Sequence, residues 1–136
     1  MDDDAGAAIV AAVRACVGTR FRAQGRVPGL GLECIGVVLV AAAASGMGRV
    51  VAPAYALGGD HADRIETFLA AAGCTAVPQP MDGDILVVVP APGQRHLAVV
   101  TPGGVVHAHA GIGRVVEGPI DGEWTIIGAW RLAGAR

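Results

Sequence analysis

The chain divides into an N-terminal part with helical apolar segments and a C-terminal part in which short apolar runs alternate with turn residues. Residues 5–17 are apolar and alanine-rich, and residues 60–72 place Ile65, Phe68 and Leu69 at helical spacing before Gly73. Between them, residues 32–45 form another apolar run. No charged side chain occurs from Cys34 to Gly48. The pattern predicts three helices, the middle one beginning near Cys34.

From residue 85 onward the pattern is typical of strands. The runs 85–89, 96–101, 104–110, 113–120 and 125–132 are rich in β-branched residues and separated by Gly, Pro and Asp. Such short connections favour an antiparallel meander. Helices followed by strands predict an α+β fold, with N-terminal helices packed on a C-terminal antiparallel sheet in a single domain over residues 1–136.

Composition narrows the class of protein. The chain is 53% hydrophobic and 16% charged with a net charge of −2, so it has no basic surface for nucleic acid. The uncharged stretch 34–48 is shorter than the roughly 20 residues of a membrane span. The start, MDDDAGAA, is acidic where a secretory signal is basic, which predicts cytoplasmic synthesis without a signal peptide. Three cysteines without metal-ligand spacing (Cys16, Cys34 and Cys74) indicate reduced thiols.

The histidines of the C-terminal part occur in one predicted hairpin. If Pro102-Gly103 is a two-residue turn, Ala98 lies opposite His107 and His96 opposite His109. Because side chains alternate along a strand, these four residues then share one face. The sequence therefore predicts a patch of imidazoles beside small residues.

Two kinds of chemistry fit this patch. A cysteine at the first turn of a helix has a favoured thiolate, and His96 could act as its general base with a second polar residue orienting the ring. Alternatively, the histidines could bind a transition metal together with Glu117. A purely structural interpretation makes Cys34 a small buried side chain and the histidines surface residues. The arginines at 20, 22 and 26 are either solvated or form the wall of a cleft for an anionic substrate.

Five segments, in order, resemble those of the NlpC-type cysteine peptidases, which are papain-like cell-wall hydrolases. They are GTRFRAQGR (residues 18–26), LECIGVV (32–38), GDILVV (83–88), RHLAVVTPGGVVHAHAG (95–111) and IIGAWRL (126–132). The similarity is strongest to the short forms of phage-tail and gene-transfer-agent clusters. It implies a papain-like fold with the nucleophile at a helix N-terminus.

The resemblance implies roles for three residues. Cys34 matches the nucleophile, His96 the base and His107 the orienting residue, with His109 as the rival for the third position. The implied reaction is hydrolysis of a γ-D-glutamyl bond to a diamino acid in peptidoglycan stem peptides, without a metal or organic cofactor. The implied location is a phage-tail or gene-transfer particle that acts on the cell wall.

Three departures from the family pattern bear on the substrate. Phe21 stands for a usual tyrosine, Glu33 for an aspartate and Ile35 for a serine. Two other functions stay open: a non-catalytic particle component with the same fold, and a related amidase or acyltransferase. Tyr55, Trp124 and Trp130 are candidates for a particle contact, with core burial as the alternative for the tryptophans.

Overall fold

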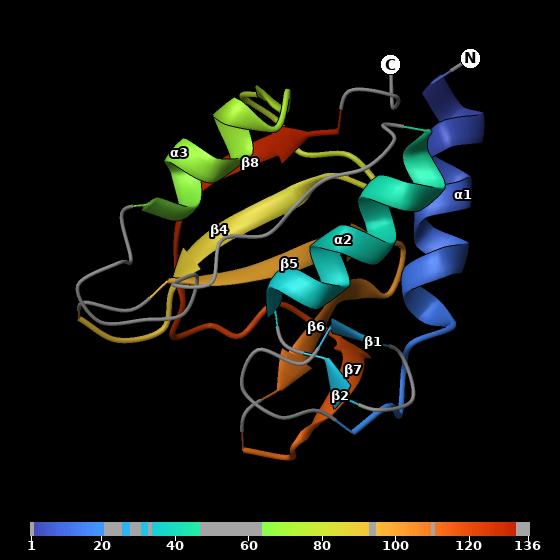
Figure 1. Cartoon of the computed structure of the whole chain (residues 1–136). Helices are drawn as coiled ribbons and strands as arrows, with labels where there is room; N and C mark the ends of the chain where they lie inside the picture. The colour runs from blue at the N-terminus through green and yellow to red at the C-terminus, as the bar shows by residue number, and fades with distance from the viewer. Residues whose placement is uncertain are drawn as a thin grey trace.

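The computed structural model describes residues 2–20, 26–27, 31–32, 34–46, 64–92, 95–109 and 111–132. In these ranges the chain forms three helices, α1 (Asp2–Arg14), α2 (Cys34–Ser45) and α3 (Arg64–Ala71). The strands are β1 (Arg26–Val27), β2 (Gly31–Leu32), β3 (Thr75–Ala76), β4 (Ile85–Val89), β5 (His96–Thr101), β6 (Gly104–His109), β7 (Arg114–Gly118) and β8 (Thr125–Arg131). The α+β class with helices on an antiparallel sheet is confirmed (Figure 1).

The main sheet has six strands in the order β3-β8-β4-β5-β6-β7, and every neighbouring pair is antiparallel. The predicted meander holds from β4 to β7 but is wrong for β8, which returns to pair with β4. The sequence of β4, ILVVV, explains this return: four of its five residues are buried. A strand that is apolar on both faces is favoured between two partners, because its backbone groups are then paired on both edges.

Two N-terminal predictions need correction. The first helix covers Asp2–Arg14, three residues earlier than expected, so the acidic residues 2–4 fall in its first turn, where the helix dipole favours them. Cys16 is buried but lies in the turn after this helix, where its N–H bonds Val13. Arg26–Val27, which the sequence pattern did not assign to a strand, form β1 and pair with β2.

The main core lies between the helices and one face of the sheet, called here the helix face. Ile9 and Val13 of α1 and Val37 and Ala41 of α2 are almost fully buried against it. The sheet contributes Ile85, Val87, Leu97, Val99, Val106, Ala108 and Val115. An almost uniformly apolar helix such as α2 requires burial on several sides, and α1, β1, β2, β5 and β6 provide it.

The opposite face of the sheet, the far face, carries a second and smaller cluster. It consists of Leu86, Val88, Ala98, Val105 and Ala129, with Trp124 packed against it. Since β4 and β5 contribute to both clusters, the centre of the sheet is fixed from both sides. Within the described part of the chain, no helix is long and apolar enough to cross a membrane.

Candidate active site

His96 and His107 meet at the start of the β5–β6 hairpin. Nε2 of His96 lies 2.9 Å from Nδ1 of His107, with ring centroids 5.0 Å apart and planes at 82°. The predicted two-residue turn is confirmed, because Thr101 pairs with Gly104 and Val99 with Val106. Continued by one residue, this register sets His107 opposite Ala98, so that His96 is its diagonal neighbour on the same face.

His109 is close to this pair but makes a different contact. Its ring centroid lies 5.6 Å from that of His107, at 36° between planes. Its Nδ1 accepts a hydrogen bond of 3.2 Å from the N–H of Ile112, in the turn after β6. The structure therefore brings His107 into hydrogen-bond contact with His96 and assigns His109 to the turn.

Trp124 packs against both imidazoles and is the site residue that sequence reasoning missed. Its ring system lies 5.4 Å from His96 at 65° and 4.8 Å from His107 at 82°. The contact depends on β8 pairing with β4: Thr125 lies opposite Val89, and Val88 lies opposite His96. A meander would have placed residue 124 beyond β7, so spacing along the chain gave no signal for it. Trp124 thus packs beside the histidines and against the far-face cluster, in line with the core-burial alternative, and a contact with a particle stays a prediction.

Burial dominates the electrostatics of the pair. It lowers the pKa of His96 from the ordinary value of 6.5 to about 4, with His107 and His109 adding repulsion to the protonated form. It also lowers the pKa of His107 to about 4; His109 acts in the same direction, and Asp121 and a bond with the Ala108 backbone act against it. Both rings are therefore neutral at pH 7 in the absence of a further charge, which is the form a general base requires.

The nucleophile predicted at Cys34 is located by its backbone. Cys34 is the first residue of α2, which packs across β5 and starts over the side of the sheet at which β5 begins (Figure 1). The side chain of Cys34 lies outside the described residues, so a contact with His96 stays a prediction. Alternation sets His96 and His107 on the far face, with Ala98 and Val105. A contact between Cys34 and His96 would therefore have to pass around the end of the sheet, where His96 is the first residue of β5.

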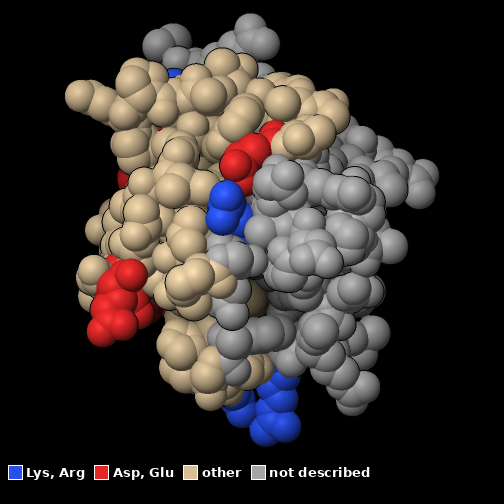
Figure 2. Space-filling model, turned by 90° about the vertical axis from the view of Figure 1, so that its left-hand side faces the viewer, with Lys and Arg blue, Asp and Glu red and all other residues tan. Residues whose placement is uncertain are grey.

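The charged residue next to His96 is paired. Nε of Arg95 lies 3.3 Å from Oε1 of Glu66 in α3, which joins that helix to the start of β5. Figure 2 shows the side of the molecule at which β4 ends and β5 begins; an acidic and a basic group lie side by side near the middle of its described surface, and further charged groups lie toward its left and lower margins. Three arginines were expected to be either solvated or the wall of a cleft. Arg20 is exposed, whereas Arg22 and the side chain of Arg26 lie outside the described residues.

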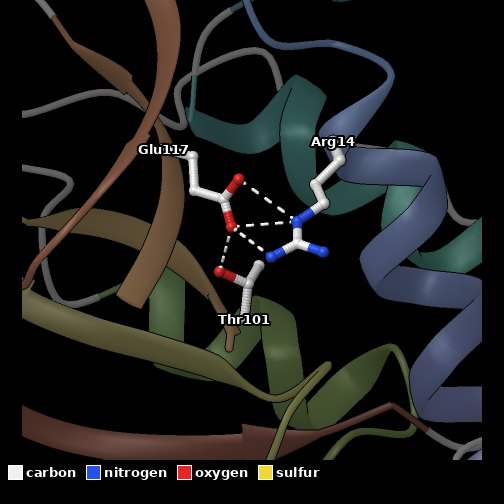
Figure 3. A network of polar contacts seen from close by, with 3 residues as sticks. All are labelled: Arg14, Thr101 and Glu117. Carbon is white, nitrogen blue, oxygen red and sulfur yellow. Dashed lines mark hydrogen bonds and ion pairs between the residues drawn. The ribbon is translucent and has the colours of Figure 1, made fainter. Parts of the chain in front are cut away.

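Glu117, considered as a metal ligand with the histidines, accepts hydrogen bonds from Arg14 and Thr101 instead. Its carboxylate accepts from Nε of Arg14 at 2.9 and 3.1 Å and from the hydroxyl of Thr101 at 2.6 Å, which ties α1 to β5 and β7 (Figure 3). The guanidinium of Arg14 and the Thr101 hydroxyl lower the pKa of Glu117. Among the described residues, no group of three or more His, Cys, Asp or Glu side chains is arranged to hold a metal ion.

The remaining residues named from sequence fall into three groups. Cys16 and Cys74 are buried free thiols, and burial raises the pKa of each, that of Cys74 to about 11. Trp130 is partly buried and packs against the main core, which agrees with the core-burial alternative for this residue. Phe21, Glu33, Tyr55 and the side chain of Ile35 lie outside the described residues.

Comparisons with known proteins add no assignment. Neither a protein-family model nor a curated protein matches this chain.

Proposed function

We propose that this protein is a cysteine peptidase of the papain-like, NlpC-type fold that hydrolyses amide bonds in peptidoglycan stem peptides. Cys34 is the proposed nucleophile, His96 the base and His107 the residue that orients the base. The observation that carries the proposal is the 2.9 Å contact between Nε2 of His96 and Nδ1 of His107. A half-buried, neutral imidazole oriented by a second polar ring is an arrangement suited to the base of a thiol nucleophile.

The position of Cys34 supports its role. A residue at the start of α2 lies beside backbone N–H groups that have no partner within the helix, and the helix dipole there favours a thiolate. The same N–H groups are suited to stabilise a developing oxyanion. Helix α2 is packed on β5, whose first residue is His96. Cys34 and His96 therefore begin two elements that contact each other.

The contact between the imidazoles is compatible with the tautomer needed for catalysis. If Nε2 of His96 carries the proton, it donates to Nδ1 of His107, and Nδ1 of His96 is left with a lone pair. That lone pair is the acceptor for the proton of the Cys34 thiol. After transfer, Nε2–H of the His96 imidazolium still donates to His107, and the bond is stronger because its donor is charged.

The reaction is an acyl transfer in two steps. The Cys34 sulfur attacks the scissile carbonyl carbon, and the proton on His96 goes to the leaving amine as the C–N bond breaks. Water then attacks the thioester, His96 accepts one of its protons, and the carboxylic acid and the free thiol are released. His107 must stay neutral throughout, and the lowering of its pKa by burial favours this.

The substrate class is proposed from the resemblance of the five segments to the NlpC-type family. The test is incubation of the purified protein with peptidoglycan fragments, followed by mass analysis. We expect products cut between D-glutamate and the diamino acid, and none with Cys34→Ala. Intact fragments with the wild-type protein would favour the non-catalytic component, and products cut at another amide would favour the related amidase.

Access to the cell wall requires a carrier or lysis if the chain is made in the cytoplasm. We propose that it is carried in a phage-tail or gene-transfer particle, as its similarity to short particle-associated peptidases implies. Fractionation of extracellular particles from the native host tests this, with detection of the protein by mass spectrometry. Recovery only outside the particle fraction would contradict the delivery proposal and leave the catalytic one in place.

A further inference from the structure

Trp124 contacts both members of the histidine pair, which gives it a place at the site that none of the motifs assigns. Its ring system lies 4.8 Å from His107 and 5.4 Å from His96, at steep angles to both. The two imidazoles are themselves only 5.0 Å apart. One indole therefore touches both partners of a single hydrogen bond.

We propose that Trp124 is a positioning residue for this pair: its indole covers the His96–His107 hydrogen bond and holds both rings in the orientation that leaves Nδ1 of His96 for the Cys34 thiol. The inference rests on the proposed function for its catalytic consequence. It concerns a residue that acts through the imidazoles and takes no part in bond making.

The turn before β8 fixes the backbone of Trp124. The N–H of Trp124 donates to the carbonyl of Asp121 at 3.1 Å, and the carboxylate of Asp121 accepts from the N–H of Glu123 at 2.8 Å. This side-chain bond to the backbone two residues on is the usual device by which aspartate tightens a turn. On the other side, Thr125 is paired with Val89 in the sheet. Trp124 is therefore held between a closed turn and a strand.

Covering the bond matters because water competes for both imidazole nitrogens. In an apolar environment an imidazole–imidazole hydrogen bond is stronger, and a ring is less free to rotate about its side-chain bonds. The cover also opposes protonation of the pair, because it removes the water that would solvate an imidazolium. The other groups that act on the pair are His109, which adds to the opposition, and Asp121 and the Ala108 backbone, which favour a charged His107.

The structural test measures titration of the imidazoles in Cys34→Ala protein, where no thiolate contributes. NMR of the ring C–H signals follows each histidine with pH in the parent and in Trp124→Phe, Trp124→Leu and Trp124→Ala. We expect midpoints near 4 in the parent, little change with Phe, and a graded rise toward 6.5 through Leu to Ala. Trp130→Phe, which removes a tryptophan packed on the main core, is the matched control and should leave both midpoints unchanged.

The kinetic test uses the same substitutions with Cys34 present. Misplacement of the base should lower kcat about tenfold or more in Trp124→Ala while KM changes less than about twofold, and Phe should restore most of kcat. If Trp124→Ala does not fold, Trp124→Leu gives the same reading. Unchanged midpoints and unchanged kcat in a folded Leu or Ala variant would overturn the positioning role. Failure of the wild-type protein to cut any wall fragment would instead overturn the proposed function, and the titrations would still test the role of Trp124.

Discussion

Nε2 of His96 lies 2.9 Å from Nδ1 of His107, on the neighbouring strand and eleven residues further along the chain. The contact uses the nitrogen of His96 that is more remote from its backbone and leaves Nδ1 for another partner. It also separates the roles of two histidines that differ by only two positions, since His109 bonds the backbone of Ile112. The arrangement makes predictions for each ring.

The first prediction distinguishes His107 from His109. Replacing His107 with Ala removes the acceptor for His96 Nε2–H, and kcat/KM for wall fragments should fall by about 10²-fold or more. Replacing His109 with Gln removes only a contact with the following turn and should change kcat/KM less than about fivefold. Steady-state kinetics of both purified variants measure the difference. Equal losses in the two variants, or a larger one for His109→Gln, would contradict the assignment.

The second prediction concerns stability and pH. Burial lowers the pKa of His96 and of His107 to about 4, below the ordinary value of 6.5, so the unfolded chain takes up protons on these rings first as the pH falls. Stability from the neutral pair is therefore complete above pH 6.5 and is lost between about 6.5 and 4. The expected loss is on the order of 3 kcal/mol for each ring, measured by urea unfolding across that range.

A double variant with His96→Gln and His107→Asn provides the control for that titration. Without either imidazole, the free energy of unfolding should change much less between pH 6.5 and 4. A parent protein whose stability falls no more than that of the double variant over the same range would refute the buried neutral pair.

The third prediction concerns the turn that aligns the two histidine strands. Gly104 has φ of +122°, and a Cβ there would collide with the backbone of Gly118 and Pro119 in β7 and just after it. Gly104→Ala should cost about 2 kcal/mol or more, because neither the backbone angle nor the space suits a side chain. Gly122→Ala is the matched control, since a Cβ there meets nothing within 4 Å, and it should cost less than about 0.5 kcal/mol. Similar midpoints for the two variants in urea would show that the turn is not constrained in this way.

The fourth prediction concerns the Arg14–Glu117–Thr101 network. Glu117→Gln removes the charge that bonds Arg14 but keeps an acceptor for Thr101, so the free energy of unfolding should fall by about 1 kcal/mol at neutral pH. Because Arg14 and Thr101 lower the pKa of Glu117, this stability is present above its ordinary value of 4.5 and is lost at more acidic pH. Glu123→Gln, at an exposed position, is the control. An equal effect of both substitutions on urea unfolding would contradict the network's contribution.

The hairpin was predictable from sequence because its signals are local. Strands β4 and β5 have the bounds that their β-branched runs indicate, and Pro102-Gly103 sets the register that brings His96 and His107 to one face. A two-residue turn and the alternation of side chains determine that geometry without knowledge of the rest of the chain.

The contact of most consequence for the site that escaped prediction joins segments distant in the sequence. The return of β8 to β4 is driven by burial of β4 on both faces, and it alone brings Trp124 to the histidines. The early start of α1 reflects the preference of a helix N-terminus for Asp2–Asp4, a weak local effect that hydrophobic periodicity does not report. Strands as short as β1 and β3, with two residues each, are too brief to show any alternation.

The central claim is that Cys34 is an activated nucleophile served by His96, and its rate of alkylation tests this most directly. The native protein is treated with iodoacetamide at pH 7, and modification of each cysteine is followed by mass spectrometry of peptides. Cys16 and Cys74 are internal controls, because both are buried and burial raises the pKa of each thiol. The account predicts that Cys34 reacts at least about tenfold faster than either, and that His96→Ala removes most of this advantage. Modification of Cys34 no faster than that of Cys16 and Cys74, or at a rate unaffected by His96→Ala, would contradict it.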